Sequence, residues 1–310
     1  MILNLFSSSV PVASEDISPY IRTYDEVWQL VDEHFLFRDR LKGWTNWRHR
    51  FDSELTDKEQ LDQSIAAMLG SLKDTYTFYR DSDATTARRA LDNEKDVVTY
   101  KKLADRIGYI RISGFCSKLC IRELSVALTN LKDCQGYILD LQDNSGGCVD
   151  IAFESFALFS PQGDFVSMKG TSVGESSPEK WYLEKNKALI ESDGDVAESL
   201  RLPNYTGNKP LVVLINENTR SAAEMLAGAL QDNGRAILLG RQSFGKGIVQ
   251  RVWDLPDNTS VKISSAYYYL PLGRAIHGVG VKPDIVVDKE PLLDKASTLI
   301  RSKQIAKIGN

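Results

Sequence analysis

The stretch YILDLQDNSGG, residues 137–147, places an apolar run directly before a turn of polar residues and glycines. Residues 137–141 are almost all apolar, as is typical of a short strand buried on both faces of a sheet. Gly146 and Gly147 end the turn, where the lack of a side chain lets the backbone approach a ligand closely. The apolar segment 149–160 then predicts a helix. A buried strand, a glycine turn and a helix together predict an α/β fold with a parallel sheet.

The same alternation of strand and helix recurs on both sides of this stretch. Further strands of the sheet are expected in three apolar runs, at residues 108–112, 211–215 and 236–239. Segment 221–233 predicts a second helix, and such β-α-β units are connected by right-handed crossovers. Beyond Gly240, alternation of apolar and polar residues predicts an added antiparallel β region. Its strands are expected at residues 248–255, 260–270 and 284–287.

The remaining segments suggest how the chain is divided. Residues 20–92 carry apolar side chains at helical spacing, so we expect a small helical N-terminal domain before a core of residues 97–290. Residues 1–19 are expected to be a disordered terminus or the remnant of a secretion signal. Residues 172–208 are polar with an acidic, helix-like middle, and we interpret them as a lid or insertion. Residues 291–310 predict a basic, partly helical C-terminal tail.

Charge and composition exclude several classes of function. The chain has 38 Lys and Arg against 42 Asp and Glu, so its net charge of -4 gives no electrostatic case for binding nucleic acid or an anionic membrane. No apolar run reaches the roughly 18 residues that a membrane-spanning helix needs. The three histidines and four cysteines are dispersed and form no metal-ligand pattern. We therefore expect no metal, no cofactor, no nucleic acid and no transmembrane segment.

Ser221 stands where a buried strand is expected to lead into the helix at 221–233. Glu224 follows it at the spacing of a capping box, which supports an ordinary serine at the helix N-cap. A serine at such a turn can also expose its hydroxyl beside backbone amides that stabilise an oxyanion. The residues alone leave both roles open.

Lys246 lies between two glycines in the segment GRQSFGKG, residues 240–247. This segment nearly matches a phosphate-binding loop, but Gly247 replaces the hydroxyl residue and a strand pattern follows instead of a helix, so nucleotide binding is not expected. On an extended segment Lys246 and Gln250 share a face, and the Gln250 amide could then position the lysine amine as a general base. That role requires burial to lower the lysine pKa, and a solvated surface lysine is the alternative.

Together these segments resemble the C-terminal processing peptidases, also called tail-specific proteases, a Ser/Lys group of serine peptidases of the S41 type. Residues 139–147 are similar to the family pattern LDLRxNPGG, and residues 210–287 are similar to its nucleophile, lysine and trailing β region. The resemblance implies a catalytic set and an oxyanion hole made of backbone N–H groups. The catalytic set would be Ser221 as nucleophile, Lys246 as base and Gln250 as its support, with the oxyanion hole formed by Gly146 or Gly147 and Ala222.

The resemblance further implies a ClpP/crotonase-like core and a serine-type endopeptidase that cleaves protein or peptide substrates near their C-terminal tail. It favours an extracytoplasmic location, and the helical N-terminal domain could mediate a homo-oligomer. Two alternatives from other classes are a non-catalytic binding protein on the same core and a crotonase-like acyl-CoA enzyme. Retention of serine, lysine and glutamine together favours the peptidase.

The chain departs from the family pattern at three places. Residues 81–98 leave no room for the PDZ domain that usually stands between the helical part and the core. Gln142 and Ser145 replace the usual Arg and Pro of the glycine turn, and Tyr76 stands where many relatives have His. Without that domain, we expect the helical N-terminal part or residues 172–208 to guide the peptide, and a partner that recognises the tail is the alternative.

Overall fold

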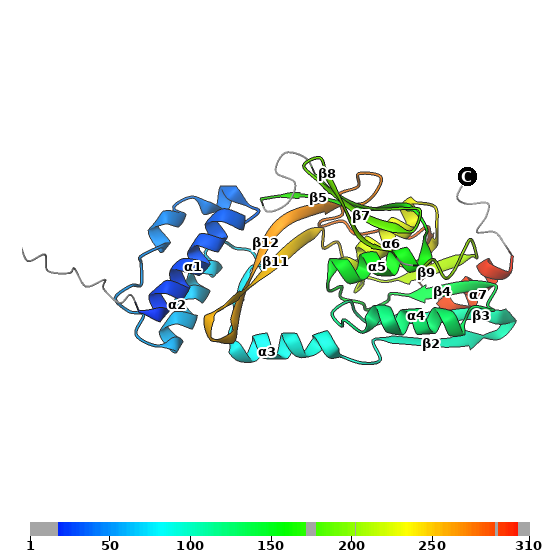
Figure 1. Ribbon diagram of the computed structural model, residues 1–310, viewed down its shortest axis with the longest axis horizontal. Coiled ribbons are helices and arrows are strands. Elements are labelled where there is room, and N and C mark those ends of the chain that lie inside the picture. Colours follow the sequence, from blue (N-terminus) through cyan, green and yellow to red (C-terminus); the bar gives the residue numbers. More distant parts are fainter. Residues whose placement is uncertain (1–17, 172–177, 202, 289–290, 303–310) are drawn as a thin grey trace, which may run out of the picture.

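The structure is a computed structural model that describes residues 18–171, 178–201, 203–288 and 291–302. The terminus expected to be disordered or a signal remnant lies outside the described residues up to residue 17. The described residues form one largely parallel sheet, one antiparallel sheet and a group of N-terminal helices (Figure 1). Within these ranges no helix is both long and apolar enough to cross a membrane.

The first sheet contains the apolar runs that the sequence singled out. Its strands in spatial order are β13 (Ile285–Val286), β10 (Ile237–Gly240), β9 (Leu211–Ile215), β4 (Gly136–Asp140), β3 (Ile107–Ile112) and β2 (Val98–Leu103). All neighbours pair in parallel except β2, which is antiparallel to β3. Every residue of β4 and β9 is buried, because helices cover both faces of the sheet. The predicted mixed α/β fold is confirmed.

Helices on the two faces bury alternate residues of the same strands. The first face is covered by α4 (Cys120–Asn130), α5 (Val149–Phe159) and α6 (Ala222–Asp232). The second is covered by α7 (Leu292–Arg301), which lies at the far right of Figure 1. On β4, Leu139 belongs to the first core and Ile138 to the second. Within the segment expected as a partly helical C-terminal tail, residues 292–301 are therefore a packed helix, and residues 303–310 lie outside the described residues.

The second sheet is antiparallel and continues past the core. Its order is β1 (Phe78–Arg80), β12 (Thr259–Tyr269), β5 (Gly163–Gly170), β6 (Glu179–Glu184), β7 (Lys187–Ser192) and β8 (Asp195–Arg201), with β11 (Ile248–Leu255) paired to β12. The long strand β12 pairs with β1 near its start and with β5 near its end. The added antiparallel β region expected after residue 240 is present in β11 and β12. The expectation that residues 284–287 belong to it is wrong, because β13 pairs in parallel with β10 at the edge of the first sheet.

The acidic, helix-like middle expected within 172–208 is wrong, because β6, β7 and β8 form an antiparallel meander there. Trp181 and Leu183 lie two residues apart on β6 and pack against the core, whereas the charged residues Lys180 and Glu184 on either side of this pair are exposed. The two-residue spacing of the core-facing side chains indicates a strand in this segment, whereas its acidic composition suggests a helix. Residues 172–177 of the proposed lid lie outside the described residues.

The N-terminal helices pack on the distal end of the β11–β12 hairpin. Helix α1 (Pro19–His34) begins with Ser18 as N-cap, and α2 (Lys58–Gly70) begins with Asp57, whose carboxylate accepts the N–H of Gln60. Their apolar faces share a core with Leu255, Val261 and Ile263 of the hairpin. Short 3₁₀ turns complete the fold: η1 (Arg38–Leu41), η2 (Trp44–Trp47), η3 (Leu91–Asn93), η4 (Ala104–Arg106) and η5 (Pro256–Asn258).

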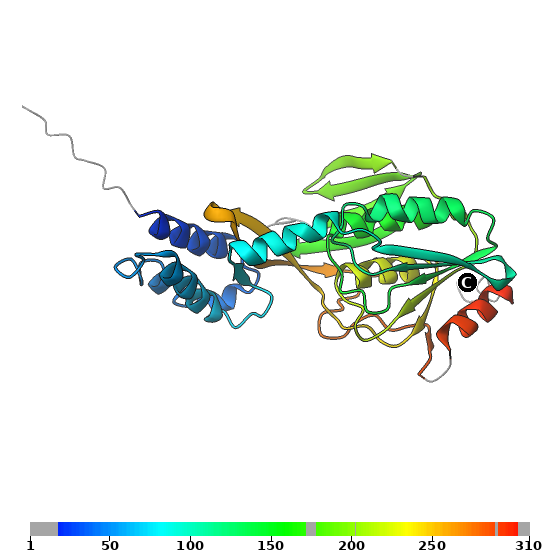
Figure 2. The ribbon, with the colours of Figure 1, turned by 90° about the horizontal axis from the view of Figure 1, so that it is seen from below.

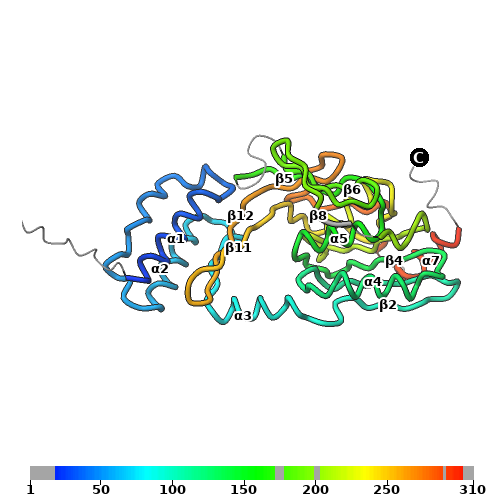
Figure 3. Tube along the Cα trace, in the orientation of Figure 1, coloured from blue at the N-terminus to red at the C-terminus, as the bar shows by residue number. Residues whose placement is uncertain are grey.

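The interval between β1 and β2 is occupied by α3 (Ser82–Ala90) and η3. Asp81 caps α3 by accepting the N–H of Ala84. In Figures 2 and 3, α3 and the β11–β12 hairpin form two separate connections between the N-terminal helices and the α/β part. A single helix therefore stands where the family pattern usually has a PDZ domain.

We expect Ile300→Ala to lower the free energy of unfolding by about 2–5 kcal/mol, because this side chain of α7 is 3% exposed against the sheet. The matched control is Val126→Ala on α4, which is 49% exposed and should change stability by less than about 0.5 kcal/mol. Urea unfolding measures both. Equal effects of the two variants would show that α7 does not pack on the sheet in solution.

Candidate active site

A cavity of about 370 Å³ lies where the glycine turn after β4, the start of α6, the β11–β12 hairpin and α3 meet. Five of the six residues predicted for the site line it: Gly146, Gly147, Ser221, Lys246 and Gln250. The sixth, Ala222, is the first residue of α6 directly after Ser221. A cavity of about 470 Å³ beneath α2 and β1 contains none of them.

Ser221 occupies a strained turn between β9 and α6. Its backbone has φ 57° and ψ -124°, a conformation that a residue with a side chain rarely adopts and that costs about 1–3 kcal/mol. The Ser221 N–H donates to the carboxylate of Glu224 at 2.8 Å, which holds the turn in place. The serine side chain thus lies beside the backbone N–H groups that begin α6.

Glu224 joins the turn at Ser221, called here the serine turn, to the loop of residues 241–247 that carries Lys246, called here the lysine loop. Its side chain is fully buried, and besides the Ser221 N–H it accepts the N–H groups of Gly245 at 2.6 Å and Lys246 at 2.8 Å. It also accepts the hydroxyl of Ser243 at 2.5 Å. The sequence indicated Glu224 as a helix cap alone. Its second role depends on contacts with residues about twenty positions later, which no local pattern reveals.

Lys246 is partly buried at the edge of the cavity, with its Nζ 5.0 Å from the ring centroid of Tyr76. Among the described residues its amine makes no hydrogen bond. Burial lowers the pKa of Lys246, and the positive charge of Arg220 lowers it further, whereas Glu224 and Asp74 act in the opposite direction. The site therefore favours a neutral lysine amine more than water does.

The two glycines of the turn after β4 differ in the use of their N–H groups. The Gly146 N–H donates to Oδ1 of Asn144 at 2.9 Å, so it is already engaged. No hydrogen bond from the N–H of Gly147 or of Ala222 is formed within the described part of the chain. A Cβ on Gly146 would lie 2.7 Å from the carbonyl oxygen of Arg220, which leaves room for glycine alone.

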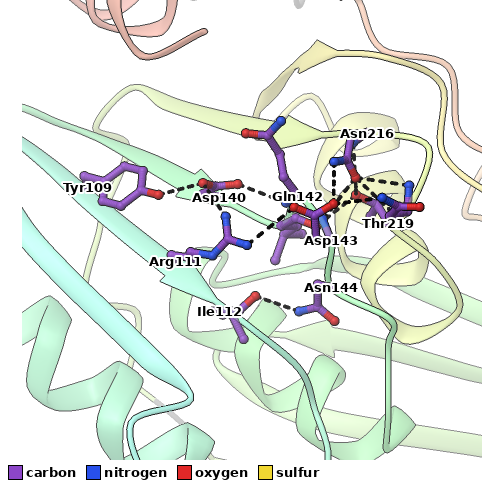
Figure 4. Close-up of polar contacts among 11 residues, drawn as sticks. Tyr109, Arg111, Ile112, Asp140, Gln142, Asp143, Asn144, Asn216 and Thr219 are labelled. Carbon is purple, nitrogen blue, oxygen red and sulfur yellow. Dashed lines mark hydrogen bonds and ion pairs between the residues drawn. The ribbon is translucent and has the colours of Figure 1, made fainter.

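A network of polar side chains fixes the glycine turn beside the serine turn (Figure 4). The Asp143 carboxylate accepts the side-chain amides of Asn216 and Asn218, each at 2.9 Å. The hydroxyl of Thr219 donates to the carbonyl of Leu141 at 2.8 Å. These bonds connect the ends of β4 and β9 and hold the two turns beside each other.

Gln250 lies on β11 just after a β-bulge between Val249 and Gln250. Its amide Nε2 donates to the carbonyl of Ile248 at 2.8 Å. Lys246 precedes the strand, and the structure shows no direct hydrogen bond between these two side chains among the described residues. They share the cavity, and Oε1 of Gln250 remains as an acceptor there.

Comparison with known proteins agrees with this architecture. Residues 106–287 match the model of peptidase family S41. A carboxyl-terminal-processing protease of Picosynechococcus is 33% identical over 243 residues, which are 75% of this chain and 53% of that protein. A carboxy-terminal-processing protease of Bartonella bacilliformis is 35% identical over 211 residues, which are 65% of this chain and 44% of that protein. The chain spans about half the length of these curated relatives.

Solved structures share the fold over nearly the whole chain. The photosystem II D1 C-terminal processing protease matches with a TM-score of 0.68 at 20% identity, covering 92% of this chain and 98% of that one. A lipoprotein from Streptococcus agalactiae matches with a TM-score of 0.69 at 18% identity, covering 97% and 99%. The family match covers the glycine turn, the serine turn and the lysine loop. From its sequence and its fold, the chain belongs to peptidase family S41.

Proposed function

We propose that the protein is a serine-type endopeptidase that cleaves protein or peptide substrates near their C-terminal tail with a Ser/Lys pair. The observation that carries the proposal is that one buried carboxylate, Glu224, holds the strained Ser221 turn and the Lys246 loop at the same cavity. Relatives named carboxyl-terminal-processing proteases support the reaction class. We assign the parallel sheet and its helices to the ClpP/crotonase type of core.

In the proposed reaction, Oγ of Ser221 attacks the scissile carbonyl while neutral Lys246 takes the hydroxyl proton. Lys246 returns that proton to the leaving amine as the peptide bond breaks and the acyl-enzyme forms. Water then attacks the acyl-enzyme and gives one proton to Lys246, and this proton returns to Ser221. Oε1 of Gln250 accepts a hydrogen bond from the lysine amine and orients it.

The N–H groups of Ala222 and Gly147 are the proposed oxyanion donors. Both belong to cavity-forming turns, and neither is engaged within the described part of the chain, whereas the Gly146 N–H is bound to Asn144. Gly146 contributes by its size, because a side chain there would contact the serine turn. Preorganised donors of this kind typically contribute about 10²–10³ in kcat each.

We expect Ser221→Ala and Lys246→Ala each to lower kcat by about 10⁴-fold or more, because each removes a group that changes its bonding during the reaction. Mass spectrometry of an unfolded protein and of a peptide library with apolar C-termini measures the cleavage. The exposed residues Ser53 and Lys42 provide the matched controls Ser53→Ala and Lys42→Ala. Cleavage by either active-site variant at the wild-type rate would contradict the assignment, and a folded wild type that cleaves nothing would favour a binding protein.

Activity should rise with pH through the lowered pKa of Lys246, because the proton acceptor is the neutral amine. Arg220→Met removes a positive charge that lowers this pKa, so the rising limb should move to higher pH. Arg241→Met, at an exposed ion pair with Glu217, should leave it in place. Profiles of kcat/KM against pH measure the shift, and a limb unmoved by Arg220→Met would rule out Lys246 as its origin.

Glu224→Gln should weaken the site in two separable ways. The amide places an NH₂ group among N–H donors, so we expect a loss of about 1–3 kcal/mol in unfolding free energy and a lower kcat. Removal of the negative charge also lowers the pKa of Lys246, so the rising limb should move to lower pH, opposite to Arg220→Met. Urea unfolding and the pH profile measure the two effects. A shift to higher pH would show that Glu224 does not act on Lys246 through its charge.

A further inference from the structure

The wall of the catalytic cavity away from the serine turn is lined by three cationic side chains. Arg80 comes from β1, Lys262 from β12 and Arg88 from α3. Helix α3 and the β11–β12 hairpin are the two connections between the N-terminal helices and the α/β part (Figure 3), and β1 pairs with β12 of this hairpin. No aspartate or glutamate is among the described residues that line this cavity.

Strand register explains why Arg80 and Lys262 face the cavity together. Lys262 of β12 lies directly opposite Phe78 of β1 on one side and Val252 of β11 on the other. Arg80 is two residues after Phe78, so it shares that face of the sheet. Gln250 is two residues before Val252 and lies on the same face. The side chains of Arg80, Lys262 and Gln250 therefore project from the same face of the sheet.

Arg80 and Lys262 have no acidic partner in the described ranges. Their cationic groups lie over the ring of Phe78, at 4.9 Å for Arg80 and 5.7 Å for Lys262. Arg88, by contrast, is paired with Asp92 at 2.9 Å and contacts Sγ of Cys148. Arg80 and Lys262 thus line the cavity without an acidic partner in the described ranges, whereas Arg88 lines it with its charge already paired to Asp92.

The cationic side chains that line the cavity repel one another, and a bound anion would relieve this repulsion. Burial and the charges of Lys246 and Arg80 lower the pKa of Lys262 to about 8. Burial and the charge of Arg88 lower the pKa of Arg80. A carboxylate between Arg80 and Lys262 would neutralise them and would accept charge-assisted hydrogen bonds from both.

We infer that Arg80 and Lys262 form a subsite for the C-terminal carboxylate of the peptide whose chain is cleaved at Ser221. This inference rests on the proposed function, because it assigns the substrate end that the same cavity holds. A C-terminal carboxylate belongs to every unmodified chain, so the subsite would select chain ends whatever their sequence. With carboxylate and scissile bond in one cavity, the released C-terminal fragment would be short.

The first experiment measures binding, independently of cleavage, with Ser221→Ala protein. A fluorescent peptide with an apolar C-terminus is compared as the free acid and as the C-terminal amide, with affinity read by fluorescence anisotropy. We expect the free acid to bind about tenfold more tightly, as a charge-assisted interaction implies. Arg80→Gln and Lys262→Met, each in the Ser221→Ala background, should abolish the difference. Equal binding of acid and amide would overturn the subsite.

The ratio of acid to amide affinity within one variant does not depend on how much of the protein is folded. The control Arg251→Gln changes an exposed residue on the other face of the hairpin, opposite Ile263, and should keep the preference. An amidated peptide with a glutamate near its end tests the other source of a carboxylate. If it binds as tightly as the free acid, the assignment to the chain terminus is overturned.

Cleavage by the wild type separates this inference from the proposed function. Cleavage of acid and amide peptides with the same kcat/KM would leave the peptidase in place and overturn the subsite. Preferential binding of the acid by Ser221→Ala, with no cleavage of either peptide by the wild type, would support the subsite and contradict the peptidase. Preferential cleavage of the free acid, lost in Arg80→Gln, would support both.

Discussion

The rest of the site depends on one buried carboxylate. Glu224 begins as a helix-capping residue of α6, yet its two oxygens also fix the backbone of the loop that carries Lys246. A buried charge is tolerated when several donors point at it, and here two turns of the chain supply them. The hydrogen bonds that Glu224 accepts offset the free-energy cost of burying its charge. The same bonds fix the serine and lysine segments relative to each other.

This carboxylate acts together with the parallel sheet. Strands β4 and β9 end side by side, and the Asp143 and Thr219 contacts connect the two turns that follow them. The strain at Ser221 persists because hydrogen bonds on both sides determine its backbone. The cavity is thus built on rigid elements, and its outer wall comes from the hairpin and α3.

The sequence predicts those helices and strands whose apolar residues follow one regular pattern along the segment. Strands β4 and β9 are apolar throughout, and α1 keeps a helical period, so local pattern and tertiary environment agree. The meander β6–β8 could not be found in this way, because its strands are half-exposed and carry charges that also suit a helix. The expected pairing of Ser221 and Lys246 comes from the resemblance to the family, because residue type and spacing alone leave both residues with ordinary alternatives. The second role of Glu224 and the facing of Arg80 and Lys262 arise from pairing between distant segments, which no local window contains.

The continuous strand β12 sets a rule for how the length of this chain can change. Its Val261 and Ile263 face the helical core, whereas Lys262 between them faces the cavity. A single inserted residue in this strand would exchange the two faces, exposing apolar side chains and burying the lysine. Length variation among related sequences should therefore collect at the hairpin tip around Pro256–Asn258, where one added residue leaves the alternation of both strands intact.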